Sequence, residues 1–160
     1  MGQAPANTRH GGGRTLVRFF FYGSLLDPDV TALVIGRRLP PSAWTPATLP
    51  GYSRRKARGV SYPVAVRDPK GVVQGAVVSG FSQREVERLT AYEGPRYHTV
   101  PLKVRSRGRI VTVSVFEPKE MAFQAVDGEW SLQQWQRHDK RWFVERIRKA
   151  FSAHPAYSRR

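Results

Sequence analysis

The chain has 160 residues, of which 40% are hydrophobic, enough for one domain with a core of its own. It contains no cysteine, which excludes a disulfide scaffold, a thiolate zinc site and a cysteine nucleophile. Its net charge of +15, from 27 Lys and Arg against 12 Asp and Glu, makes attraction to polyanions a hypothesis to weigh.

The two ends of the chain resemble tails rather than targeting signals. Residues 1–15 are rich in Gly, Ala, Asn and Pro and lack the apolar segment of a secretory signal, so we expect a disordered tail. We expect residues 153–160 to form a frayed basic end. No apolar run approaches the roughly 20 residues of a membrane helix. A single domain over residues 16–152, in a cytoplasmic protein, is therefore predicted.

The chain begins its predicted structure with a strand and a helix. Residues 17–22 (VRFFFY) form an apolar, β-rich run typical of a buried strand. Asp27 suits a helix N-cap, and Pro28 suits the first helical position. Gly36 is expected to end that helix.

The next stretch predicts strands separated by prolines. Residues 37–50 are Pro-rich and are expected to be irregular, and a strand is expected within residues 51–59. The pair Tyr62-Pro63 is expected to interrupt pairing, because proline has no N–H to donate to a ladder. Residues 72–78 (VVQGAVV) then predict a further strand.

The middle of the chain predicts a capped helix and a hairpin. Ser82 and Glu85 form the pattern of a capping box, and Gly94 stops the helix that follows. Residues 100–104 and 110–116 alternate as the two strands of a hairpin do.

The last element is predicted to be one long helix capped by Ser131. Its apolar side chains recur at helical spacing: Leu132, Trp135, Trp142, Phe143 and Ile147. Helices are too few for a repeated βαβ wheel, so we predict an α+β domain with a mixed or mostly antiparallel sheet, curled towards a barrel.

The first candidate site is the junction Tyr22-Gly23-Ser24-Leu25 between the first strand and helix. Such a turn can aim successive backbone N–H groups at one point, as a carboxylate or a developing oxyanion requires. An ordinary strand-to-helix turn remains the alternative. Ser24 lies in no G-x-S-x-G elbow, so we interpret its hydroxyl as positioning rather than nucleophilic.

The second candidate is Glu93, at the C-terminal end of the capped helix and followed by Gly94. The helix dipole is negative there, and Tyr92 and Tyr97 lie nearby in sequence, so the carboxyl tends towards a raised pKa. A raised pKa suits a general base. A surface acid near a helix end is the alternative.

The spacing of the histidines in the sequence does not indicate a metal site. They are widely separated, and none pairs with an acid at ligand spacing: His10, His98, His138 and His154. We expect neither a metal nor a cofactor.

Taken together, four stretches resemble the γ-glutamylcyclotransferase-like family, in the branch of the plant avirulence-induced proteins. They are FFFYGSLLDPDV, LPGYSRRKARGVSYPVAV, VVQGAVVSGFS and LTAYEGPRYHTVPL. A late stretch, GEWSLQQWQRHDKRWFVERI, is similar to the C-terminal helix of that branch. The resemblance covers residues 17–147.

The resemblance implies a small α+β barrel with flanking helices. It also implies release of 5-oxoproline from a γ-glutamyl compound by intramolecular aminolysis, with Glu93 as proton acceptor. The substrate-binding residues that the family motifs imply, together with the nearby Tyr97, are Tyr22, Gly23, Ser24, Leu25, Leu26, Asp27, Tyr62, Pro63 and Tyr97. A monomer acting on a small γ-glutamyl substrate is expected. Thr90 stands where the family often has an Asp, and the stretch that includes His98, Tyr97-His98-Thr99-Val100, stands where it often reads Y-x-R-V.

Two other functions stay open. The first is a non-catalytic relative that binds a glutamyl-like ligand as a sensor or regulator. The second is a nucleic-acid-binding protein, which needs aromatic side chains exposed among basic clusters. Because Trp135, Trp142 and Phe143 recur at core spacing, a solvated basic surface without specific nucleic-acid binding is the prediction.

Overall fold

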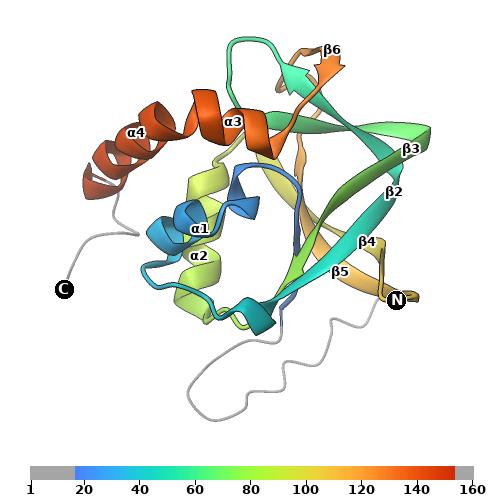
Figure 1. Cartoon of the computed structure of the whole chain (residues 1–160), viewed down its shortest axis with the longest axis horizontal. Helices are drawn as coiled ribbons and strands as arrows, with labels where there is room; N and C mark the ends of the chain where they lie inside the picture. The colour runs from blue at the N-terminus through green and yellow to red at the C-terminus, as the bar shows by residue number, and fades with distance from the viewer. Residues whose placement is uncertain (1–16, 154–160) are drawn as a thin grey trace.

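The computed structural model describes residues 17–153 (Figure 1). The two predicted tails, residues 1–15 and 153–160, lie outside the described residues, apart from Ala153, the last residue of the final helix.

Five strands close into a barrel, with a sixth attached at its edge. The strands are β1 (Phe19–Phe21), β2 (Trp44–Ala57), β3 (Pro63–Val78), β4 (Tyr97–Ser106), β5 (Arg109–Pro118) and β6 (Ala125–Glu129). They follow the order β3-β1-β5-β4-β2, and β2 pairs again with β3 to close the ring. Only β1 and β5 run parallel among the described pairings, and β6 pairs with β2. The predicted α+β fold with a mixed barrel is confirmed.

The apolar run around β1 is buried on both faces. Phe20 and Tyr22 belong to the cluster that fills the barrel, whereas Phe19 and Phe21 belong to the cluster beneath the helices. Alternate side chains of a strand point to opposite faces, so both faces of β1 need apolar residues. This explains why the sequence shows a continuous apolar run there.

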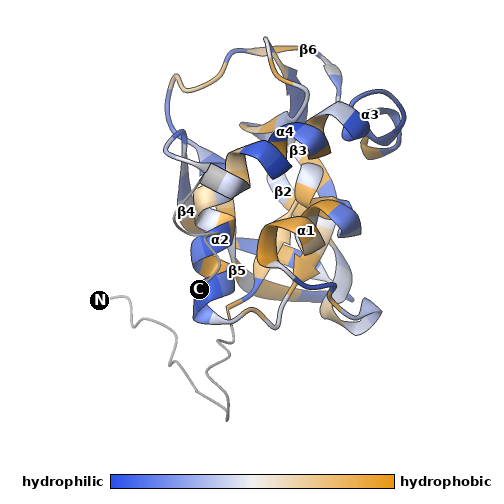
Figure 2. Ribbon diagram, turned by 90° about the vertical axis from the view of Figure 1, so that its left-hand side faces the viewer, coloured by the Kyte–Doolittle hydropathy of each residue, from blue (hydrophilic) through white to orange (hydrophobic). Residues whose placement is uncertain are grey.

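Four α-helices among the described residues cover one side of the barrel (Figure 1). They are α1 (Pro28–Ile35), α2 (Gln83–Glu93), α3 (Leu132–His138) and α4 (Lys140–Ala153), and two short 3₁₀ turns precede α1 and β2: η1 (Ser24–Leu26) and η2 (Pro41–Ala43). Helix α1 is largely apolar, and hydrophilic residues dominate the outer sides of α2 and α4 (Figure 2).

The predicted helix signals for α1 and α2 are confirmed. The Asp27 side chain accepts from the first turn of α1, and Gly36 ends it in the left-handed conformation, with φ 87°. Ser82 and Glu85 form both hydrogen bonds of the capping box that starts α2. These signals are local, so the sequence alone is enough to place both helices.

Two predictions for this stretch are only partly right: residues 37–43 and Tyr62 lie outside the strands, but residues 44–50 and Pro63 belong to them. Strand β2 already begins at Trp44, and it pairs with β3 from Trp44↔Val78 to Lys56↔Pro63. Pairing of β2 with β4 on its other side is confined to Thr48↔Arg105, which leaves room for prolines. Pro63 opens β3, and the first residue of a strand tolerates proline.

The predicted long C-terminal helix is two helices, with the break at Asp139. Trp135, before the break, is 1% exposed, whereas Trp142 is 67% exposed. The break changes the phase of the helical repeat, so Trp142 leaves the apolar face on which the sequence had placed it. Phe143 and Ile147 remain packed against the core.

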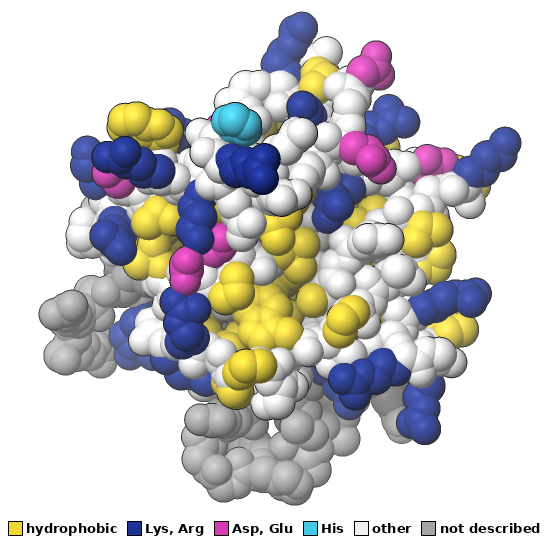
Figure 3. Space-filling view, viewed as in Figure 1, with side chains coloured by type: hydrophobic (Ala, Val, Ile, Leu, Met, Phe, Trp, Pro, Cys, Tyr) yellow, Lys and Arg dark blue, Asp and Glu magenta, His cyan; other side chains and the backbone are white. Residues whose placement is uncertain are grey.

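The positive charge is spread over the molecule. Figure 3 shows Lys and Arg side chains around the whole of one face, with apolar side chains gathered near its centre. No helix of residues 17–153 is both long and apolar enough to cross a bilayer.

Candidate functional site

A cavity of about 270 Å³ lies where one end of the barrel meets the helices. Its walls come from the end of β1, the η1 turn, the start of β3, the end of α2 and the inner side of α4. The residues predicted for the site that line it are Tyr22, Gly23, Ser24, Leu25, Tyr62, Pro63, Glu93 and Tyr97. The fold therefore brings eight sequence-predicted positions, from four separate segments, to one hollow.

The η1 turn lines this cavity and begins with backbone amides that have no partner inside the turn. Within the turn, the Leu26 amide donates to the Gly23 carbonyl and the Asp27 amide donates to the Ser24 carbonyl. The amides that precede the first internal bond of a helical turn have no partner within it, so those of Ser24 and Leu25 are available to a ligand. A Cβ on Gly23 would lie 3.2 Å from the ring of Pro63, so a glycine here lets the turn pack closely against β3.

Side-chain hydrogen bonds hold the turn in place. The Ser24 Oγ lies 2.5 Å from the Tyr92 hydroxyl oxygen, which ties the turn to the last residues of α2. The Tyr22 hydroxyl donates to the Phe116 carbonyl at 2.7 Å, and Arg54 donates to the Tyr22 carbonyl at 3.1 Å. Hydrogen bonds from α2, β5 and β2 thus hold the turn in place.

Glu93 is the last residue of α2 and the only acid among the described residues that line the cavity. It keeps an intermediate exposure because it borders the hollow, but protein atoms surround its carboxyl. This burial raises the pKa of Glu93 from 4.5 to about 8.

Three tyrosines around Glu93 complete a low-polarity wall. Burial raises the pKa of Tyr62, Tyr92 and Tyr97, and the negative charge of Glu93 adds to the increase at each. All three therefore stay neutral at pH 7, and their hydroxyls can donate hydrogen bonds to an anion in the cavity.

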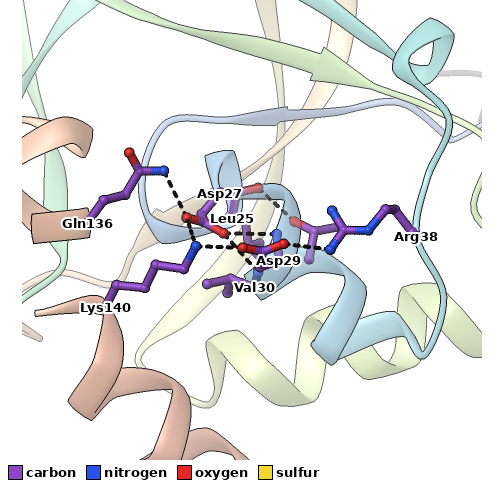
Figure 4. Close-up of polar contacts among 8 residues, drawn as sticks. Leu25, Asp27, Asp29, Val30, Arg38, Gln136 and Lys140 are labelled. Carbon is purple, nitrogen blue, oxygen red and sulfur yellow. Dashed lines mark hydrogen bonds and ion pairs between the residues drawn. The ribbon is translucent and has the colours of Figure 1, made fainter.

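Leu26 and Asp27, also predicted for the site, are not among the residues that line the cavity. Asp27 is fully buried and caps α1, where its Oδ1 accepts from the amides of Asp29 and Val30 at 2.8 and 3.1 Å. Its Oδ2 accepts from the Gln136 amide at 2.8 Å and lies 2.9 Å from the Lys140 Nζ (Figure 4). In this arrangement Asp27 joins α1 to the C-terminal helices.

Sequence reasoning missed the contribution of α4 to the cavity. Five of its residues line the hollow: Phe143, Arg146, Ile147, Ala150 and Phe151. Their consecutive spacings of three, one, three and one residues place them on one helical face. The spacing was visible in the sequence, but nothing in it shows that this face closes over Glu93.

The described residues contain no group of three or more His, Asp or Glu that could hold a metal ion. His98 is exposed, with its Nε2 3.9 Å from the Glu117 carboxylate, and His138 is exposed on α3. His10 and His154 lie outside the described residues.

A closed mixed barrel flanked by helices, with Glu93 and the strand-to-helix turn lining one cavity, fits the fold expected of the γ-glutamylcyclotransferase-like class. The chain belongs to the family described as "Gamma-glutamyl cyclotransferase, AIG2-like", whose model matches residues 19–137. The resemblance predicted from the sequence is confirmed.

Relatives support this membership. "AIG2-like protein A" of Arabidopsis thaliana is 34% identical over 136 residues, which covers 81% of this chain and 78% of the relative. A solution structure from the same plant is 33% identical, with a TM-score of 0.62 over 86% of this chain and 91% of the other. A solved gamma-glutamyl cyclotransferase has a TM-score of 0.56 at 18% identity, over 68% and 69% of the chains, and shows likeness of fold.

Proposed function

We propose that this protein is a γ-glutamyl cyclotransferase that releases 5-oxoproline, with Glu93 as its general base. The observation that carries the proposal is the Glu93 carboxyl, buried in the same cavity as the turn Tyr22–Leu25. Family membership supports a function of this class.

The reaction is an internal aminolysis of the substrate. The α-amine nitrogen attacks the γ-carbonyl carbon, and the bond between that carbon and the leaving-group nitrogen breaks. The α-ammonium nitrogen loses two protons on the way to the lactam, one before it attacks and one as the ring forms. We propose that Glu93 takes each in turn and passes it to the departing nitrogen, which leaves as an ammonium. Atoms and charges balance without an oxidant or a co-substrate, so we propose a cofactor-independent reaction.

The pKa of Glu93 suits this proton transfer. An α-ammonium has a pKa of about 8, and an ordinary glutamic acid one of about 4.3, so transfer between them costs roughly 5 kcal/mol. Burial raises the pKa of Glu93 to about 8, which nearly removes this difference. Burial thus supports the role proposed for Glu93 as the base.

The second part of the proposal concerns the turn, which would stabilise negative charge on the substrate while Glu93 moves the protons. We propose that the amides of Ser24 and Leu25 stabilise negative charge on the glutamyl part, an effect on the order of 3 kcal/mol for one well-placed donor. The bond between Ser24 and Tyr92 holds these amides in register with Glu93, because Tyr92 directly precedes it. Aromatic walls limit water around the reacting atoms and help to hold the glutamyl chain curled.

Mass spectrometry for 5-oxoproline, across γ-glutamyl amino acids, amines and isopeptides, tests this function. Wild type is expected to release 5-oxoproline from at least one compound, and Glu93→Gln is expected to lose at least about 99% of the rate. The matched control is Glu87→Gln, which makes the same change at an exposed position of α2. Release by a folded Glu93→Gln protein at the wild-type rate would falsify the general-base role. Absence of release from the whole panel by a folded wild type, with retained ligand binding, would instead support the sensor alternative.

We propose further that the protein acts as a cytoplasmic monomer on a small γ-glutamyl compound, without specific nucleic-acid binding. Size-exclusion chromatography with light scattering tests the monomer, and a salt titration with random-sequence DNA tests the binding. Only weak, steeply salt-dependent binding is expected from the surface charge.

A further inference from the structure

A second hollow, of about 600 Å³, lies at the other end of the barrel. The cavity that contains Glu93 lies where β1 ends and where β3 and β4 begin. The second hollow lies where β1 begins and where β3 and β4 end, and the tip of the β4–β5 hairpin beside it points away from α3 and α4 (Figure 1). The two hollows share no residue among the described residues that line them, so they are separate sites.

Three arginines line the second hollow from two segments of the chain. Arg18 directly precedes β1, and Arg107 and Arg109 lie at the tip of the β4–β5 hairpin. All three are exposed, so their guanidinium groups are accessible to a ligand. The fold thus brings together positive charges that are almost ninety residues apart in the sequence.

The sequence supplies no counter-charge for these arginines. No Asp or Glu is among the described residues that line the hollow. Within residues 17–153, none of the three arginines forms an ion pair with an acid. Residues 1–16 and 154–160 contain no Asp or Glu at all. An anion from outside the chain is therefore the group that can balance the three charges.

The hairpin turn carries an arginine at a position that favours another residue. Arg107 and Gly108 form a two-residue turn between the paired residues Ser106 and Arg109, with φ of 51° and 73°. Asn is favoured before Gly in such a turn, because most L side chains are disfavoured in the left-handed region. A residue that is held in a disfavoured conformation beside a hollow indicates a role for its side chain there.

We propose that this hollow binds a small anion with two or more phosphate groups, through Arg18, Arg107 and Arg109. A guanidinium binds phosphate oxygens through charge-assisted, often bidentate hydrogen bonds. The hydroxyls of Thr45 and Ser79, which also line the hollow, are further donors for such oxygens. A single phosphate group carries a charge of about −1.5 to −2 at pH 7, so two phosphates match three arginines better than one does.

A nucleic acid fits this hollow less well than a small phosphate compound. Proteins that bind single-stranded nucleic acids without sequence preference stack the bases on aromatic side chains. No aromatic side chain is among the described residues that line the second hollow, where the apolar residues are Val77 and Val111. The site therefore offers contacts to phosphate groups but no surface for a base.

Calorimetric titration of the full chain with pyrophosphate, at an ionic strength of about 0.15 M, tests the site because salt at this level screens diffuse attraction to the surface. One saturable site is expected. Arg107→Asn removes a guanidinium and gives the turn its favoured residue, so it should unfold in urea no more easily than wild type and bind pyrophosphate about tenfold more weakly. Arg18→Gln and Arg109→Gln should weaken binding by a similar factor.

Two controls separate this site from the general positive charge of the protein. Arg148→Gln removes the same charge from an exposed position of α4 outside both hollows, and it should keep the wild-type affinity. Arg107→Asn should release 5-oxoproline at the wild-type rate when no pyrophosphate is present, since residue 107 lies outside the Glu93 cavity. The anion site and the cyclotransferase function therefore stand or fall separately.

Three results would overturn the anion site. The first is an absence of saturable pyrophosphate binding to wild type. The second is an equal loss of affinity in Arg107→Asn and Arg148→Gln, which would mean diffuse attraction to a basic surface. The third is random-sequence single-stranded DNA that binds more tightly than pyrophosphate and is weakened by the same variants, which would assign the hollow to a nucleic acid. Saturable binding of pyrophosphate that only the arginines of the hollow affect supports the proposal.

Discussion

Replacing Glu93 by Gln is expected to make the protein more stable at neutral pH while it removes the proposed base. The pKa of Glu93 is about 8 in the folded protein against an ordinary value of 4.5, so between these values the folded state holds a proton that the unfolded state has lost. Stability therefore falls as pH rises from about 4.5 to about 8, and the loss is complete above that window. A neutral glutamine has no such proton to lose.

The size of the effect follows from the same two values. Linkage gives a penalty of about 1 kcal/mol at pH 5 and of about 3 kcal/mol at pH 7, and Glu93→Gln is expected to recover at most these amounts. Water that enters the cavity reduces the penalty, so both numbers are upper bounds.

Urea unfolding of wild type and variant at pH 5 and pH 8 measures this difference. The gain in the free energy of unfolding should grow with pH for Glu93→Gln and should stay near zero for the exposed control Glu87→Gln. A Glu93→Gln protein whose stability relative to wild type is the same at both pH values would refute the reasoning, because the carboxyl would then titrate normally.

Three further outcomes follow from individual contacts. Asp27→Ala removes the buried cap of α1 and its link to Lys140, so it should reduce the free energy of unfolding by about 2–4 kcal/mol. The exposed Asp29→Ala should reduce it by less than about 1 kcal/mol. Chemical denaturation compares the two variants, and equal losses would contradict the buried role of Asp27. Tyr92→Phe removes the hydroxyl beside Ser24 and should lower kcat/KM for 5-oxoproline release about tenfold. Tyr52→Phe, which removes a hydroxyl outside the cavity, should leave kcat/KM unchanged. An unchanged kcat/KM in Tyr92→Phe would show that the bond between Ser24 and Tyr92 does not position the turn. Trp135→Ala should reduce the free energy of unfolding by about 3–5 kcal/mol, and Trp142→Ala should reduce it by about 0.5 kcal/mol or less. Thermal unfolding compares the two variants, and a larger loss in Trp142→Ala would contradict the observed break in the C-terminal helix.

Features set by a few neighbouring residues were predictable from the sequence. Asp27 and Pro28 start α1, Ser82 and Glu85 start α2, and each prediction is confirmed because a cap depends on backbone groups only two or three residues away. The turn at residues 22–25 was located for the same reason.

Features set by distant partners were not predictable in this way. Strand β2 continues through Pro46 and Pro50 because β3 pairs with it along its length, a partner that the local sequence does not show. The burial of Asp27 against Lys140, more than a hundred residues later, is likewise a product of the fold. Family resemblance linked Glu93 to the turn, but the contribution of Arg146 and α4 to the cavity emerged only from the structure.

The proton affinity of Glu93 is the property on which the proposed chemistry depends most, and carbon-13 NMR measures it directly. In protein labelled at the glutamate carboxyl, the resonance missing from Glu93→Gln identifies residue 93. We predict that this resonance titrates with a midpoint near pH 8. A midpoint near 4.5, the ordinary value for glutamate, would contradict a desolvated base matched to the α-amine of a γ-glutamyl substrate.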